Sequence, residues 1–187
     1  MGALLQQSAA LGQAAHFRAL LLHVLARDDA AEALMQTNKR GESVLHLAAY
    51  KGHLGVLQEI RTRDCMWREL LVMLTADYGW SCLHIAAEEG HLEVVMLLME
   101  AGGRELLMLT ADYGWSCLHS AALEGHLEVA KLLVEAGGRE LLMLTASNSL
   151  THGWSCLHIA AEKGHLEVAK LLSEAGGASC SCCFDSS

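Results

Sequence analysis

Histidine and cysteine are the residues of this chain whose types and spacing could support metal binding or thiol chemistry. The chain has 11 histidines and 7 cysteines, and a cysteine two residues before a histidine, with another histidine soon after, provides residue types that bind zinc. The histidines recur in two slots, as His46, His84, His119 and His158, and as His53, His91, His126 and His165. The recurring cysteines are Cys82, Cys117 and Cys156.

This spacing does not favour a metal site. A structural zinc site needs four converging ligands, whereas side chains two positions apart on a helix point in different directions. Cys82 and His84 have that spacing, and His91 lies beyond a glycine. We therefore predict that the histidines are structural and that the chain uses no metal or other cofactor.

The recurring cysteines have two interpretations. Each would occupy the first position of a helix, where the helix dipole lowers a thiol pKa and favours a redox sensor. Alternatively, cysteine is a small side chain that fills a buried or half-buried slot, which is the interpretation we favour. No histidine is placed consistently as a base, so a catalytic cysteine is not predicted.

Three more cysteines lie outside the recurring slots, in a serine-rich stretch that we expect to be a flexible tail over residues 178–187. They are Cys180, Cys182 and Cys183. A thiol or metal sensor built on these three residues stays open as a hypothesis.

The elements that position these residues follow from a repeated string. Gly-Trp-Ser-Cys-Leu-His occurs at Gly79–His84, Gly114–His119 and Gly153–His158, with a diverged copy at Gly41–His46. The copies begin 35 to 39 residues apart. A regular period of this length predicts one supersecondary unit that is copied and stacked.

Within one unit the residues predict two short antiparallel helices. Ser81 is placed to cap a helix that starts at Cys82, and Gly90 ends that helix near Glu89. A second helix follows over 92–101, where leucine and valine cover too much of the surface for a single buried stripe. Such a hairpin cannot bury its apolar surface alone, so the units must stack.

These motifs resemble the ankyrin repeat, whose signature is Gly-x-Thr-Pro-Leu-His-x-Ala-Ala-x-x-Gly-His. Gly79–His91 matches it, with serine for threonine and cysteine for proline, and so do Gly41–His53, Gly114–His126 and Gly153–His165. The resemblance covers residues 41–177. It implies an all-α ankyrin-repeat solenoid in which the histidines hydrogen-bond turns within and between repeats. It also implies a protein-binding role without catalysis.

The chain departs from the ankyrin pattern between units, where the period exceeds the usual 33 residues. The extra stretch Arg104–Thr110 is rich in leucine, which predicts an added helical turn that replaces part of the usual β-hairpin finger. We expect a capping helical pair, a diverged repeat, over residues 1–40. The four repeats are predicted at about 41–78, 79–113, 114–152 and 153–177.

The composition of the chain limits the kinds of partner that it could bind. The formal net charge is −9 and the pI is near 5.6, which argues against a nucleic-acid footprint and fits a basic partner. No apolar run is long enough to span a bilayer, and the first residues lack the features of a secretory signal. With an odd number of cysteines, this predicts an intracellular and reducing setting, cytoplasmic or nuclear.

Aromatic residues beside the turn glycine are the best candidates for binding, because tryptophan and tyrosine are common in binding hot spots. In ankyrin-like proteins this slot lies near the loop tips, at the edge of the concave face. The alternative is that each tryptophan packs on the loop of the next repeat. The candidates are Trp80, Trp115, Trp154, Tyr78 and Tyr113.

First-helix positions that vary between repeats are the second set of candidates. Their apolar and acidic mixture would favour a basic, partly apolar segment, although an acidic face with no partner is an equal alternative. The main candidates in this set are Glu88, Glu89, Leu123, Glu124 and Lys163. The other varying positions are Leu47, Tyr50, Lys51, Ile85, Ser120, Ile159 and Glu162.

We therefore predict a non-enzymatic interaction scaffold that binds a protein through its loop tips and concave face. A second hypothesis is a targeting or regulatory segment of a larger enzyme or signalling protein, with the thiol or metal sensor as a third.

Overall fold

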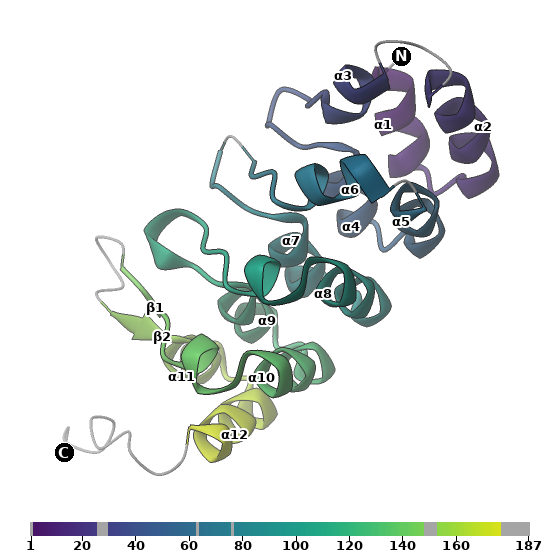
Figure 1. Ribbon diagram of the computed structural model, residues 1–187. Coiled ribbons are helices and arrows are strands. Elements are labelled where there is room, and N and C mark those ends of the chain that lie inside the picture. Colours follow the sequence, from purple (N-terminus) through teal and green to yellow (C-terminus); the bar gives the residue numbers. More distant parts are fainter. Residues whose placement is uncertain (1, 26–29, 63, 76, 148–152, 177–187) are drawn as a thin grey trace, which may run out of the picture.

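The computed structural model describes residues 2–25, 30–62, 64–75, 77–147 and 153–176. These residues are almost entirely helical, and their helices form two layers of a solenoid (Figure 1). The first helices of the units are α1 (Gly2–Ala10), α4 (Val44–Tyr50), α7 (Cys82–Glu88), α9 (Cys117–Glu124) and α11 (Cys156–Lys163). The second helices are α2 (Ala14–Leu25), α5 (Leu54–Arg61), α8 (Leu92–Leu107), α10 (Leu127–Leu142) and α12 (Leu166–Ala175).

Helices of each layer contact their counterparts in the neighbouring units. The first-helix layer runs through α1, α4, α7, α9 and α11, and the second-helix layer runs through α2, α5, α8, α10 and α12. Figure 1 shows loops projecting from the first-helix layer, on the side away from the second helices. This arrangement confirms the predicted all-α solenoid of stacked helix-turn-helix units.

The serine and histidine of the repeated string start each first helix. At α7 the Ser81 hydroxyl accepts from the backbone N–H of His84 at 3.4 Å, while the backbone N–H of Ser81 donates to Nδ1 of the same histidine. This reciprocal capping box satisfies two donors that a helix N-terminus leaves unpaired. The same box occurs at α4, α9 and α11.

The cysteines of the string are buried, as we favoured. Cys82 and Cys117 are fully covered, and Cys156 is 1% exposed. Burial raises the pKa of each of the three thiols to about 12. Desolvation therefore outweighs the helix dipole at this position, and these cysteines are not activated thiolates. The tail cysteines lie outside the described residues.

Two of the second helices, α8 and α10, join directly to the added helical turn across a kink at a glycine. We expected α8 to close at Gly102-Gly103, but the helix resumes after a kink and ends at Leu107. At the kink Gly103 has φ 55° and ψ −148°, a backbone conformation that is essentially restricted to glycine. The continuation provides the added helical turn expected over Arg104–Thr110, and it buries Leu106. Gly138 makes the same kink in α10.

The remaining elements lie in the loops between units. They are α3 (Ala30–Met35), α6 (Asp64–Leu71), the 3-10 turn η1 (Asp112–Gly114), and the strands β1 (Thr145–Ala146) and β2 (Trp154–Ser155). The two strands pair antiparallel, with Thr145 opposite Ser155 and Ala146 opposite Trp154. A single bridge joins Thr110 and Ser116 in the preceding loop. A short hairpin therefore persists beside the added helical turn.

Histidines of the first slot link each repeat to the following one. The Nε2–H of His46 donates to the backbone carbonyl of Trp80 at 3.1 Å. His84 donates in the same way to Trp115 at 3.0 Å, and His119 to Trp154 at 3.3 Å. Each of these histidines therefore holds both its own cap and the next loop.

Histidines of the second slot reach in the opposite direction, to the turn of the preceding unit. Nε2 of His91 donates to the carbonyl of Tyr50 at 3.1 Å, that of His126 to Glu88 at 2.7 Å, and that of His165 to Leu123 at 2.9 Å. His53 bonds the carbonyl of Ala10 at 3.2 Å. This last bond joins the N-terminal unit to the stack in the same way as the later repeats are joined.

Candidate protein-binding surface

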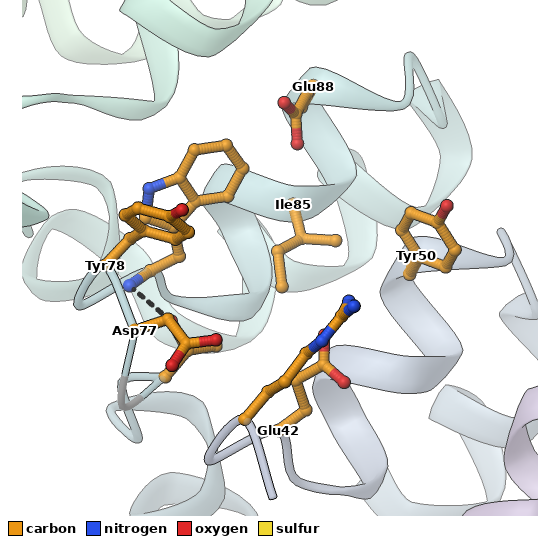
Figure 2. Close-up of a pocket in the computed structure, with 9 residues that line it drawn as sticks. Glu42, Tyr50, Asp77, Tyr78, Ile85 and Glu88 are labelled. Carbon is orange, nitrogen blue, oxygen red and sulfur yellow. Dashed lines mark hydrogen bonds between the residues drawn. The ribbon is translucent and has the colours of Figure 1, made fainter.

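A hollow opens where the loops meet the first-helix layer, between the first two copies of the string. Its volume is about 410 Å³. Its lining residues are Arg40, Glu42, Tyr50, Thr75, Asp77, Tyr78, Trp80, Ile85 and Glu88. Figure 2 shows Ile85 between Glu88 and the loop that carries Asp77 and Tyr78, with Tyr50 across from Tyr78.

The aromatic wall of the hollow is held in place by the loop backbone. The Trp80 N–H donates to Thr75 Oγ1 at 3.0 Å, and the Thr75 N–H donates to the Trp80 carbonyl at 2.9 Å. These bonds close the loop, so that the rings of Tyr78 and Trp80 lie 6.3 Å apart and tilted by 52°. Tyr78 is 64% exposed, which leaves its ring available for contact.

The charged part of the wall is acidic. Glu42, Asp77 and Glu88 line the hollow, against the single base Arg40. Burial, together with the smaller effect of the charges of Glu89 and Glu124, raises the pKa of Glu88 to about 7. A carboxyl in this state is stabilised in its ionised form by a nearby cation. The hollow thus combines aromatic and apolar surface with carboxylates.

Tyrosines of adjacent loop tips are held in a row. The Asp112 N–H donates to the Tyr78 carbonyl at 3.0 Å, and the Ser147 N–H donates to the Tyr113 carbonyl at 2.8 Å. Tyr113 is 66% exposed, and its φ of 61° is the one positive value outside glycine in the described residues. The loops are therefore bonded to one another, and two of them carry an exposed tyrosine.

The tryptophans lie differently from the tyrosines, because all three are half-buried. Nε1 of Trp115 donates to Oγ of Ser120 at 3.0 Å, and its indole lies 5.3 Å from the ring of His119. Trp154 stacks on His158 with an interplanar angle of 28°. Each of these two indoles contacts a residue of its own repeat.

The structure places the remaining candidates in three settings. Glu89 and Glu124 are exposed and lie close enough to affect Glu88. Leu123 is half-buried and contributes its carbonyl to a repeat boundary. Lys163 is exposed at the end of α11, with no part in the hollow.

Two of the other varying positions are not available to a partner. Ser120 is fully buried, because it accepts the bond from the Trp115 indole, and Ile159 is 2% exposed. Sequence reasoning also missed four residues of the hollow, which are Arg40, Glu42, Thr75 and Asp77. The sequence feature that could have identified these four residues is their position in the loop before or around the turn glycine. This place is shared by Asp112 in the next repeat.

The described ranges contain neither a metal-binding cluster nor a membrane-spanning helix. Histidine, cysteine, aspartate and glutamate do not gather in any group of three or more that could hold a metal ion. Among the same residues, no helix is long and apolar enough to cross a membrane.

Comparison with known families identifies the class of this chain. A model of ankyrin repeats in three copies matches residues 64–141 and 108–182. Together with the stacked hairpins, this shows that the chain belongs to the ankyrin-repeat family, whose members are generally protein-interaction modules and typically not catalytic. The comparison with curated proteins finds no matching sequence.

Proposed function

We propose that this protein is a non-enzymatic scaffold that binds a basic, partly apolar segment of a protein partner along its loop tips and concave face. The observation that carries this proposal is the hollow, where Tyr50, Tyr78 and Ile85 stand beside Glu42, Asp77 and Glu88. A lysine or arginine side chain matches such a wall. Its aliphatic stem covers apolar surface, while its charge faces carboxylates and aromatic rings.

The row of loop tips extends this surface beyond the hollow. An extended segment seated at Tyr78 would next meet Tyr113, because the two loops are bonded to each other. The chain's net charge of −9 also favours a basic partner during encounter, since complementary charge accelerates association. The tryptophans support the loops from inside and contribute only the edge that they leave exposed.

The experiment is binding of a short fluorescent peptide in which lysines alternate with leucines, followed by anisotropy at low and physiological salt. We expect Asp77→Asn and Tyr78→Ala each to weaken binding by about tenfold, which corresponds to about 1.4 kcal/mol. Both side chains are exposed, so neither substitution should change the unfolding transition. The charge-matched control is Glu135→Gln on α10, which should leave binding unchanged.

The protonation of Glu88 gives a second readout of the same site. A bound cation favours the ionised carboxylate, whose pKa in the free protein is about 7. Affinity for the lysine peptide should therefore rise as the pH increases from 6 to 8, and Glu88→Gln should flatten this profile. Binding that does not depend on pH, on Asp77 or on Tyr78 would show that the hollow is not the site.

A further inference from the structure

The carboxylates of the hollow come from three different segments of the chain. Glu42 precedes α4, Asp77 lies in the loop before α7, and Glu88 is the last residue of α7. Figure 2 shows Glu88 on one side of Ile85, and both Glu42 and Asp77 on the other side. A cation that carries its charge at a single point can therefore approach only some of these carboxylates closely.

The aromatic rings of the hollow form two walls, one of which already holds a cation. Nζ of Lys51 lies over the ring of Tyr50, 4.7 Å from its centre. The tilted pair Tyr78 and Trp80 forms the other wall, and Tyr78 lies across the hollow from Tyr50 (Figure 2). Asp77 precedes Tyr78 in the same loop. A flat cation that lies on the ring of Tyr78 thus has a carboxylate in the same loop.

Burial within the hollow removes water from charged groups. Glu88 is half-buried, and desolvation is the largest cause of its raised pKa. Glu42 is half-buried too, and its Oε2 accepts from Nδ2 of Asn38 at 2.6 Å. A cation that enters must also give up part of its hydration. This loss costs less for a guanidinium than for an ammonium, because the guanidinium is more weakly hydrated.

The next repeat boundary has the same loop but different charges. Residues 75–84 and 110–119 are identical, so Asp112 and Tyr113 repeat the acid and the ring of the first loop. The other three positions change between the two boundaries: Trp80 takes the position of Glu42, Ser120 that of Ile85, and Leu123 that of Glu88. Of the three carboxylates, only that of Asp77 has a counterpart. The arrangement of three carboxylates around an apolar centre therefore belongs to the first boundary.

We infer that the hollow is a pocket for one arginine side chain of the bound segment, in preference to lysine. This inference rests on the proposed function, because it specifies which basic residue the hollow accepts. The planar guanidinium stacks on the ring of Tyr78, and its five N–H donors form a fork that serves carboxylates standing apart. The aliphatic stem covers Ile85. A lysine ammonium has three donors at one point, so it leaves more of the carboxylates unpaired.

The test compares fluorescent peptides that differ only in their basic residues. One is the peptide in which lysines alternate with leucines, and in the other every lysine is replaced by arginine. Anisotropy is measured at physiological salt and pH 8, where Glu88, with its pKa of about 7, is ionised. We expect the arginine peptide to bind about tenfold more tightly, the effect of one added stacking or charged hydrogen-bond contact. A citrulline peptide, which keeps the shape without the charge, should lose this binding.

Variants of the hollow locate the preference. Tyr78→Leu removes the ring but keeps an apolar side chain, so it should bring the two affinities close together, while Tyr78→Phe should retain the preference. Glu88→Leu introduces the residue of the next repeat and should also reduce the preference. Arg40→Gln should strengthen the binding of both peptides, because it removes a like charge from the wall. The matched control is Tyr113→Leu in the identical neighbouring loop, which should leave the ratio of affinities unchanged.

The outcomes separate this inference from the proposed function. Equal affinities for the arginine and lysine peptides, or tighter binding of lysine, would overturn the arginine pocket and leave the binding of a basic segment standing. Failure of both peptides to bind would overturn the two together. An arginine preference that persists in both Tyr78→Leu and Glu88→Leu would place the preference outside the hollow, and this result would also overturn the inference.

Discussion

Three histidines show how single residues hold this stack together. Burial lowers the pKa of His46, and it lowers the pKa of both His84 and His119 to about 4. Each ring is therefore neutral, with Nδ1 accepting from its own serine N–H and Nε2–H donating across the repeat boundary. A neutral imidazole is the only form that accepts at one nitrogen and donates at the other.

These histidines should make the stability of the protein depend on pH. Their folded pKa lies below the unfolded value of about 6.5, so the unfolded chain binds more protons between pH 6.5 and pH 4. The unfolding free energy should be highest above pH 6.5 and should fall with decreasing pH through this window. The expected slope is about 1.4 kcal/mol per pH unit for each fully coupled histidine. Urea titrations at several pH values measure it.

Substitution separates the histidine contribution from that of other groups, among them Glu88, whose raised pKa of about 7 gives a slope of the opposite sign in the same pH window. His84→Gln should lower the unfolding free energy at pH 7, because it removes a helix cap and a bond across the repeat boundary. It should also reduce the slope of the unfolding free energy against pH by the contribution of one histidine. A slope between pH 6.5 and pH 5 that is the same in the parent and in His84→Gln would contradict this account.

At the scale of elements, the kinked second helix links a buried core to an exposed loop. Gly103 lets α8 change direction, and the turn after it buries Leu106 and leads into the bonded loop of Tyr113. On the exposed side, the Arg61–Glu100 and Arg104–Glu140 ion pairs join neighbouring units along this layer. Exposed pairs contribute little energy individually, so the glycine and the leucine are the stronger determinants.

Gly103→Ala should therefore destabilise the protein through its backbone alone. Nothing lies within 4 Å of the added Cβ, so the cost is that of holding alanine at a positive φ, about 1–3 kcal/mol. Gly138→Ala provides an internal replicate, because its dihedral angles and open surroundings are nearly the same. Denaturant unfolding that shows no loss for either variant would mean that the kink is not fixed by glycine.

The same helix shows which parts of the fold were predictable. The caps at Ser81 and Gly90 and the start of the second helix at Leu92 follow from local chemistry, and the structure has all three. The added helical turn after the glycines was also predicted, but as a separate piece and not as a direct continuation of α8 across a kink at Gly103. The burial of Leu106 and Leu107 against the stack favours this continuation. Local signals therefore predicted the caps, whereas tertiary packing decided the helix length.

The candidate site was predictable to a smaller extent. Tyr78 and Trp80 were named as aromatic residues beside the turn glycine, and Tyr50, Ile85 and Glu88 as first-helix positions that vary between repeats. Arg40, Glu42, Thr75 and Asp77 line the same hollow, yet they belong to loops whose lengths differ. The way in which a loop folds back over the next helix is not contained in a helical period, so the sequence does not predict these neighbours.

At the scale of the whole molecule, the contribution of a side chain to the unfolding free energy depends on its position in the stack, even where the local sequence is the same. Leu118 and Leu157 occupy the same slot of the same string, but Leu118 is fully buried and Leu157 only partly. Leu118 lies between two neighbouring repeats, whereas Leu157 has a described repeat on one side only.

Leu118→Ala should lower the unfolding free energy by about 2–5 kcal/mol, the usual cost of a cavity in a closed core. Leu157→Ala should cost clearly less, because the site already faces solvent and can relax. Chemical denaturation of the two variants measures the difference. Equal costs would indicate that the last repeat is covered as fully as the third.

The near-identity of the second and third repeats also affects how the length of the protein can change. Residues 100–111 and 135–146 are identical, so a deletion of residues 104–138 would join Gly103 to Arg139 without creating any new local sequence. A duplication of residues 104–138 would likewise insert one complete unit. Recombination between these stretches of the gene can thus lengthen or shorten the array by whole repeats, with every boundary histidine still facing its carbonyl.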